Sequence, residues 1–153
     1  MSFKKVNQTI IDQLIEVVGQ SYVLLDEKAF KKYGHDETED YLFYPEVVVI
    51  PKTPQEIANI FKICNKENIP LTPRGAGTGL SGGALPVNKG VLLSMERFNS
   101  ILDIDERNLQ ATVEPGVITQ VFQEAVQDKG LFYPPDPASK GSCFVGGNLA
   151  ENS

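Results

Sequence analysis

The residues with the clearest chemical potential form a glycine-rich stretch directly after a short apolar segment. Within nine residues the chain carries five glycines: Gly75, Gly77, Gly79, Gly82 and Gly83. Glycine tolerates positive φ and lets neighbouring backbone N–H groups point at one anion. Residues 68–95 hold no Asp or Glu, although the chain is acidic elsewhere, while Arg74 and Lys89 are present. The stretch predicts a binding site for a diphosphate-like anion; the alternative is a flexible surface loop.

The glycine spacing alone does not identify the nucleotide. Residues 77–82 satisfy the pattern G-x-G-x-x-G, but a Rossmann turn with that pattern must open a helix. Here Pro86, Asn88 and Gly90 prevent a helix. A P-loop requires Gly-Lys followed by Ser or Thr, and the chain contains no such tripeptide. The sequence context therefore excludes both common nucleotide motifs.

Residues suited to catalysis or metal binding are sparse. His35 is the only histidine, has no cysteine nearby, and opens an acidic run at residues 35–40 that we expect to be a solvated loop. Cys64 and Cys143 lie far apart, without metal-type spacing. We therefore assign no catalytic residue and no metal ligand. Both thiols are expected to be structural and reduced, which favours a cytoplasmic location.

Size and charge limit the class of protein. A chain of 153 residues fits one domain, and its net charge of -6 argues against binding to nucleic acid or to an anionic membrane surface. No apolar stretch approaches the ~18 residues of a membrane span. The first residues lack the apolar core and cleavage site of a secretory signal.

Helix and strand patterns indicate how the glycines are positioned. Apolar stripes predict helices at residues 9–18 and 26–33. The β-branched run at residues 47–50 predicts a buried strand, and Thr53, Pro54 and Glu56 then supply the start signals of a helix over residues 53–66. Its inward positions are Ile57, Ile60, Phe61 and Cys64. A strand at residues 69–72 completes a βαβ unit that leads into the glycines.

The second half continues with short elements. After a strand at residues 91–95, two strands at residues 101–104 and 109–113 flank a polar turn. A helix follows at residues 119–128, with Val121, Phe122 and Ala125 facing inward. We then expect a strand at residues 131–133, a rigid proline loop, and a second glycine-bearing turn at residues 141–147.

Two segments carry a resemblance to a known family. Residues 73–83 resemble the pyrophosphate loop of the FAD-linked oxidases, also called PCMH-type or vanillyl-alcohol-oxidase-like flavoproteins, and residues 133–153 are similar to that family's second flavin-contacting segment. The motifs are most similar to the branch that contains the flavin subunit of glycolate oxidase and the D-lactate and D-2-hydroxyglutarate dehydrogenases. The resemblance implies an α+β PCMH-type FAD-binding fold, with the N-terminal βαβ subdomain and the start of the second subdomain. It divides the chain into an N-terminal helical segment, residues 1–40, and an FAD-binding domain, residues 41–153, that is incomplete at its C-terminus.

The resemblance also implies which residues bind FAD. The diphosphate would be wrapped by the backbone of Arg74, Gly75, Ala76, Gly77, Thr78, Gly79, Gly82 and Gly83. The ribityl chain and isoalloxazine ring would be lined by Pro135, Gly141, Ser142, Gly146, Gly147, Asn148, Ala150 and Asn152, with Asp136 as a further candidate. Covalent members carry a histidine four residues after the loop arginine. This chain has Thr78 there, so the resemblance implies noncovalent FAD.

The implied reaction is oxidation of a 2-hydroxy acid by hydride transfer to flavin N5. In the family, the substrate-binding and catalytic groups lie in the C-terminal half, so we expect this chain alone to be inactive and its FAD binding to be weak or undetectable. Two alternatives stay open: a nucleotide- or flavin-binding module without catalysis, and a module that self-associates through an exposed sheet edge.

Overall fold

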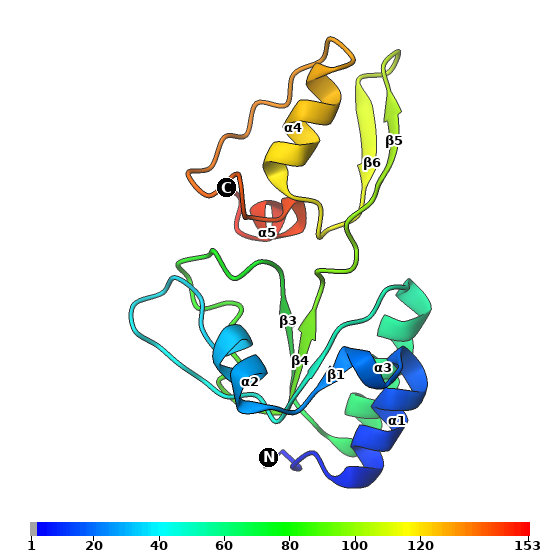
Figure 1. Ribbon diagram of the computed structural model, residues 1–153, viewed down its shortest axis with the longest axis vertical. Helices are drawn as coiled ribbons and strands as arrows, with labels where there is room; N and C mark the ends of the chain where they lie inside the picture. The colour runs from blue at the N-terminus through cyan, green and yellow to red at the C-terminus, as the bar shows by residue number, and fades with distance from the viewer. Residues whose placement is uncertain (1–2) are drawn as a thin grey trace.

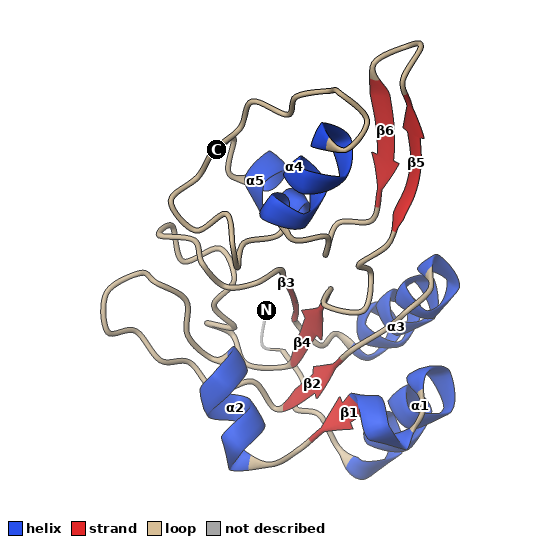
Figure 2. Ribbon diagram, turned by 45° about the horizontal axis from the view of Figure 1, so that its top comes forward, coloured by secondary structure: helices blue, strands red, loops and turns tan. Residues whose placement is uncertain are grey.

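The computed structural model describes residues 3–153, which fold into two lobes joined by a narrower waist (Figure 1). The first lobe contains a four-stranded sheet with helices on both faces, and the second contains a two-stranded sheet with two helices. Figure 2 shows α1 and α3 together on one side of the larger sheet, while α2 lies on the other side. The predicted mixture of helices and strands is therefore confirmed.

The sheet of the first lobe has the strand order β1-β2-β4-β3. Its strands are β1 (Val23–Leu24), β2 (Val47–Val49), β3 (Leu71–Arg74) and β4 (Val91–Ser94). β2 and β3 both pair with β4 in parallel, whereas β1 pairs with β2 in antiparallel orientation. Every residue of β2 and β4 is buried, as expected for parallel strands covered on both faces.

Three capped helices cover this sheet. α1 (Gln8–Val18) and α3 (Pro54–Glu67) begin at the side-chain caps Asn7 and Thr53, and a 3-10 turn, η1 (Gln20–Tyr22), leads from α1 into β1. These two helices pack on the face that includes Val47, Val49 and Leu93. α2 (Glu27–Tyr33), capped by Asp26, packs on the opposite face. The sequence predicted all three helices to within two residues.

The second lobe is built on β5 (Ile101–Asp105) and β6 (Gln110–Val113), an antiparallel pair. α4 (Thr119–Gln127) and the short α5 (Val145–Ala150) complete the lobe. Their common core contains Val117, Phe122, Val126 and Val145. No helix within residues 3–153 combines the length and apolar character needed to cross a bilayer.

Several predicted features are wrong. Residues 131–133 form no strand, because no neighbouring strand pairs with them; Tyr133 instead packs its ring 4.7 Å from that of Phe122. The predicted strand at residues 69–72 lies two residues further on, as β3. Phe61 and Val121, predicted to face inward, are exposed, because each sits at the edge of its helix's apolar stripe.

Candidate functional site

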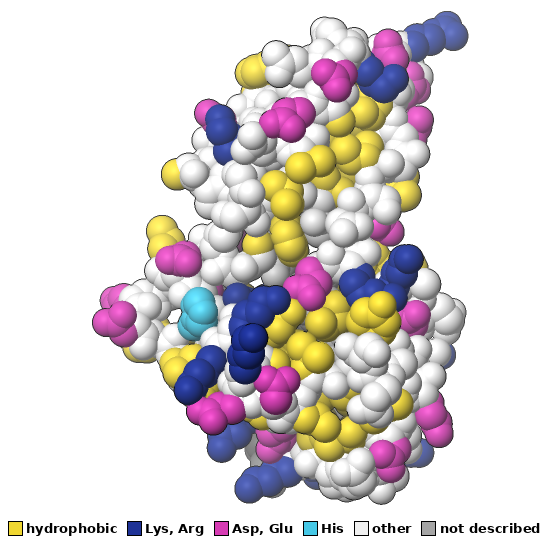
Figure 3. Space-filling model, in the orientation of Figure 1, with side chains coloured by type: hydrophobic (Ala, Val, Ile, Leu, Met, Phe, Trp, Pro, Cys, Tyr) yellow, Lys and Arg dark blue, Asp and Glu magenta, His cyan; other side chains and the backbone are white. Residues whose placement is uncertain are grey.

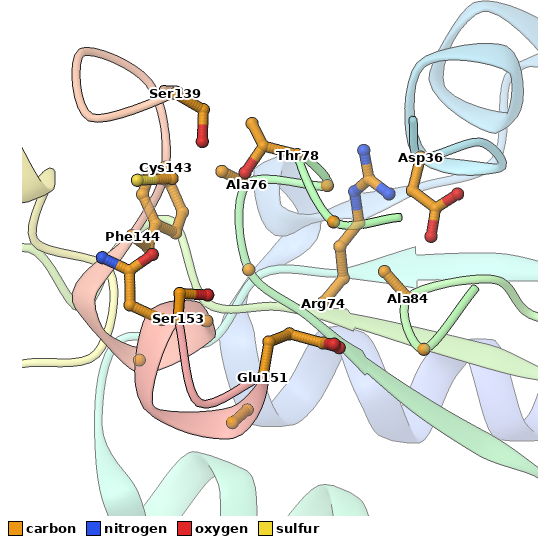
Figure 4. Close-up of a pocket in the computed structure, with 18 of the residues that line it drawn as sticks. Asp36, Arg74, Ala76, Thr78, Ala84, Ser139, Cys143, Phe144, Glu151 and Ser153 are labelled. Carbon is orange, nitrogen blue, oxygen red and sulfur yellow. The ribbon is translucent and has the colours of Figure 1, made fainter. Parts of the chain in front are cut away.

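A cleft of about 660 Å³ lies between the lobes, within the range of about 300–1,000 Å³ typical of small-molecule sites. One wall is the glycine loop, defined here as residues 74–83, which begins at the last residue of β3 (Figure 1). The opposite wall comes from α5 and the residues just before it. Figure 4 shows Ala76 and Thr78 on the first wall facing Phe144 and Ser153 on the second.

The glycine loop, which lines this cleft, carries backbone donors that no group of the described chain uses. Within residues 3–153, the N–H groups of residues 76–81 donate to no protein acceptor. Gly77 adopts φ +76° and Gly82 φ +73°, a region that L side chains rarely enter. The loop lines the cleft and does not begin a helix. Backbone N–H groups without protein partners, in a bend of this kind, are the donors from which an anion-binding nest is built.

Two members of the loop serve the protein itself. The Gly82 N–H donates to Thr38 Oγ1 at 2.8 Å, so it is not free for a ligand. The Arg74 side chain is buried, and its Nη1 donates to the His35 carbonyl at 2.6 Å. Burial lowers the pKa of Arg74, and the neighbouring Asp36 carboxylate opposes that shift. In Figure 4 the guanidinium lies on the Asp36 side of the loop, away from Phe144.

The second wall is held by a buried polar cluster. Asn148 Nδ2 donates to Thr119 Oγ1 at 2.6 Å, and Thr119 Oγ1 lies 3.2 Å from Cys143 Sγ. Gly146 fits closely against Pro115: its N–H donates to the Pro115 carbonyl, and an added Cβ would lie 2.6 Å from the Pro115 Cβ. These contacts fix α5 beside the cleft.

The two glycine-bearing segments expected to share one site do so in part. The cleft wall contains eleven of the predicted residues: Arg74, Gly75, Ala76, Gly77, Thr78, Gly79, Gly83, Gly146, Gly147, Asn148 and Ala150. Six lie outside it: Gly82, Pro135, Asp136, Gly141, Ser142 and Asn152. Asp136 pairs with Lys140 at 2.8 Å, and the Pro135 carbonyl accepts from Gln123. The turn expected at residues 141–147 is wrong for its last three residues, which begin α5.

Sequence reasoning missed two acidic residues of the cleft. The acidic run at residues 35–40 was expected to be solvated, but Asp36 is only 5% exposed and lines the cleft. Glu151 reaches from the end of α5 to accept a hydrogen bond from Ser81 Oγ at 2.7 Å. The absence of acids from residues 68–95 therefore does not make the site free of acids, because the fold brings both carboxylates from distant segments. Among the cleft-lining residues that the structure describes, Arg74 is the only cation.

Apolar side chains provide the rest of the cleft. Met95, Pro115 and Phe144 line it, and the Phe144 side chain comes within 3.7 Å of a Cβ placed on Gly75. Figure 3 shows hydrophobic side chains continuing from the second lobe into the waist. Neutral amide donors beside an apolar wall fit a ligand that combines a diphosphate with a flat ring system. The residues present therefore fit FAD.

Comparisons with known proteins agree with this geometry. The family model described as the FAD binding domain matches residues 45–153, and the chain belongs to this family. FAD is thus the cofactor of its class, and the expected PCMH-type fold is confirmed by the solved structures it resembles. Alkyldihydroxyacetonephosphate synthase superposes with a TM-score of 0.86 at 21% identity, over 98% of this chain and 30% of that one. Substrate-bound p-cresol methylhydroxylase gives 0.73 at 26% identity, over 85% of this chain and 27% of that one.

Curated relatives narrow the class to FAD-linked oxidoreductases. Glycolate oxidase subunit GlcD of Bacillus subtilis is 43% identical over 97% of this chain and 32% of its own length. GlcD of Escherichia coli strain K12 is 41% identical over 95% and 29%, and D-lactate dehydrogenase of Anaerostipes hadrus is 36% identical over 99% and 32%. The chain therefore spans about a third of the length of these relatives. The expected similarity to this branch of the family is confirmed.

Proposed function

We propose that this chain forms the FAD diphosphate-binding portion of an oxidoreductase that oxidises a 2-hydroxy acid. The observation that carries the proposal is the run of N–H groups at residues 76–81 that have no protein acceptor within residues 3–153, in a loop that lines the cleft opposite Phe144. When bound, FAD supplies the oxidising flavin, and the chain supplies its orientation. The glycolate and D-lactate names of the relatives support the substrate class.

The site residues divide into two groups in this proposal. The backbone of residues 75–79, with Gly83, binds the diphosphate, and Gly147, Asn148 and Ala150 line the flavin side of the cleft. Thr78 stands where covalent members of the family have histidine, so FAD is held noncovalently. Pro135, Asp136, Gly141, Ser142 and Asn152 stay proposed FAD contacts, because each lies within two residues in sequence of a residue that lines the cleft.

We also propose that the chain divides near residue 40 into an N-terminal segment and an FAD-binding domain. The FAD-binding family match begins at residue 45, near the proposed boundary at residue 40. However, β1 joins the same sheet as β2, and α1 packs against α3. The N-terminal segment therefore acts as one folding unit with the first lobe.

Ligand titration tests the binding part of the proposal. The melting temperature of the purified chain is measured with millimolar FAD, ADP, adenosine or riboflavin, since stabilisation follows RT ln(1 + [L]/Kd). We expect FAD and ADP to raise it and adenosine and riboflavin to raise it less, with affinity too weak for flavin to survive purification. Equal shifts from ADP and adenosine would contradict diphosphate recognition.

The substrate class is tested on the whole protein. Under anaerobic conditions, glycolate, D-lactate and D-2-hydroxyglutarate are each added to the flavin-loaded protein, and the flavin absorbance is followed. Bleaching by at least one of these 2-hydroxy acids, and none by the matching 2-oxo acid, is expected. A flavin that no 2-hydroxy acid bleaches would contradict the substrate assignment and favour a noncatalytic flavin-binding module.

We also propose a cytoplasmic location. Within the described chain Cys64 and Cys143 are both buried and free, which suits a reducing compartment. Localisation of the tagged whole protein by cell fractionation tests this, and recovery with the periplasmic or membrane fraction would contradict it.

A further inference from the structure

The glycine loop is bonded to a segment that precedes it by about forty residues. This buttress segment, residues 34–38, follows α2. Its Glu37 N–H donates to the Gly79 carbonyl at 3.1 Å, and its Thr38 Oγ1 accepts from the Gly82 N–H at 2.8 Å. Its His35 carbonyl accepts from the Arg74 guanidinium. The loop is therefore attached near its start, its middle and its end.

Thr38 is itself fixed by a buried carboxylate. The Thr38 N–H donates to Asp36 Oδ1 at 2.9 Å, so the two residues form a local side-chain-to-backbone turn. Asp36 is buried and lies in the field of the Arg74 guanidinium. These two hydrogen bonds, from Thr38 N–H to Asp36 and from Gly82 N–H to Thr38, are called the relay below. The relay holds Gly82, whose φ is +73°.

The far side of the buttress segment is anchored to the first lobe. The Gly34 N–H donates to the Phe30 carbonyl of α2, and the Phe43 N–H donates to the Gly34 carbonyl. A Cβ at Gly34 would collide with both carbonyl oxygens of Phe30 and Phe43. Tyr33 Oη donates to the Glu96 carboxylate, whose oxygens lie at 3.0 and 2.9 Å. The segment is therefore anchored on both sides, although the side chains of His35 and Glu37 are exposed as expected.

Fixing the loop matters for binding. A flexible segment must be ordered when a ligand binds, and ordering one residue costs about 1–2 kcal/mol. The N–H groups of residues 76–81 point at an anion together only if the bend between Arg74 and Gly82 keeps its shape. Thr38 is not among the residues that line the cleft, so it acts on a ligand only through this bend.

We propose that Thr38, oriented by Asp36, is a positioning residue that preorganises the glycine loop for the FAD diphosphate. The inference rests on the proposed function for its ligand, but the hydrogen bond to Gly82 exists without it. The relay predicts that loop geometry and diphosphate affinity depend on the hydroxyl of residue 38.

The test compares Thr38→Val, which removes the hydroxyl, with Thr38→Ser, which keeps it. Thr112→Val is the matched control, because Thr112 is exposed on β6 in the second lobe and does not line the cleft. Amide hydrogen exchange at Gly82 is measured by NMR on the ligand-free chain, and FAD and ADP affinities are measured by titration. We expect Thr38→Val to speed Gly82 exchange and to weaken both ligands about tenfold, as loss of one hydrogen bond implies. Thr38→Ser and Thr112→Val are expected to stay within about twofold of the parent.

Each outcome decides one of the two proposals. Faster Gly82 exchange with unchanged FAD affinity would overturn the positioning role of Thr38. If neither the parent chain nor the whole protein binds FAD or ADP, the proposed function fails, and the exchange data still decide whether Thr38 fixes the loop. If Thr38→Val does not fold, the parent alone is informative: Gly82 must exchange more slowly than Thr78 and Gly79, and equal rates would overturn the relay.

Discussion

At the residue scale, the glycines of the cleft serve two different purposes. Gly77 and Gly146 are required by the protein: a Cβ on Gly77 would collide with the Arg74 guanidinium, and one on Gly146 would press on Pro115. Gly79 and Gly147 have nothing within 4 Å of an added Cβ, yet both line the cleft. At these two positions the protein itself leaves room for a side chain, so we expect any requirement for glycine to come from a bound ligand.

Gly79→Ala separates ligand binding from stability. The φ of Gly79 lies outside the left-handed region and its Cβ meets nothing, so the melting temperature should stay the same or rise slightly, as for other compatible glycine replacements. The methyl group would block close approach of the diphosphate, and we expect FAD affinity to fall about tenfold or more, equivalent to about 1.4 kcal/mol. Calorimetry and FAD titration of the same preparation check this. Unchanged affinity would place the diphosphate elsewhere.

The buried thiol of Cys64 should make the free energy of unfolding fall at alkaline pH. Burial raises the pKa of its thiol to about 11, above the ordinary value of about 8.5. The folded state therefore binds the thiol proton more tightly, so this contribution is complete below about pH 8.5 and is lost as the pH rises toward 11. It amounts to about 3 kcal/mol.

The test is urea unfolding of the parent and of Cys64→Ala between pH 8 and pH 11. The difference between the two curves gives the contribution of the thiol alone, because tyrosines and lysines that titrate in the same range are present in both proteins. The parent should lose stability more steeply than Cys64→Ala. Parallel curves would show that the thiol titrates normally in the folded chain.

The residue scale also shows what sequence reasoning can and cannot find. The glycine loop was predictable because its residues are contiguous and glycine itself carries the backbone chemistry. Asp36 and Glu151 were not, because a carboxylate in an acidic run or at a helix end carries no local sign of burial or of its distant partner. Phe144 likewise reaches the cleft only through the packing of α5.

At the element scale, α5 is the clearest departure from the sequence-based expectation. Two adjacent glycines lower helix propensity by about 1 kcal/mol each, which made residues 141–147 resemble a turn. Tertiary contacts override that cost: the Val145 N–H donates to the Val117 carbonyl, and the Gly146 N–H donates to the Pro115 carbonyl. Most of the strands and the longer helices could be predicted without such tertiary contacts, since their apolar patterns and caps are local in the sequence.

Gly147→Ala tests this account of α5. Alanine favours the helix, and its Cβ meets no protein atom, so we expect the ligand-free chain to gain up to about 1 kcal/mol. FAD affinity should nevertheless fall, because the methyl group enters the cleft. Gly146→Ala is the matched control and should lower stability through its clash with Pro115. Thermal unfolding with and without FAD gives both quantities. A Gly147→Ala variant that is less stable would mean that α5 is not helical at this residue.

At the scale of the whole molecule, the first lobe has a well-covered sheet, whereas the second has only two paired strands. An isolated two-stranded sheet is marginal and leaves both outer edges unpaired. Leu102 of β5 is also exposed. The fold of the first lobe was largely predictable from its βαβ pattern, but the meeting of the two lobes around a cleft depends on long-range contacts that no sequence period encodes.

Self-association is expected through β5 and β6. Sedimentation velocity over a hundredfold range of concentration should show a growing dimer population. Leu102→Lys should reduce it, because edge and face lysines disfavour strand pairing between copies. Val87→Lys, a change at an exposed position of the first lobe, is the control. A chain that stays monomeric at every concentration would contradict self-association through this sheet edge.

The Ser81–Glu151 hydrogen bond across the cleft has a consequence for ionic strength. Sites that attract phosphates with lysine and arginine lose affinity as salt screens those charges. Here the donors are uncharged amides, and the charge of Arg74 is offset by the Asp36 and Glu151 carboxylates that line the same cleft. Added salt would screen repulsion instead of attraction. The affinity of this cleft for its dinucleotide should therefore be as high at high ionic strength as in dilute buffer.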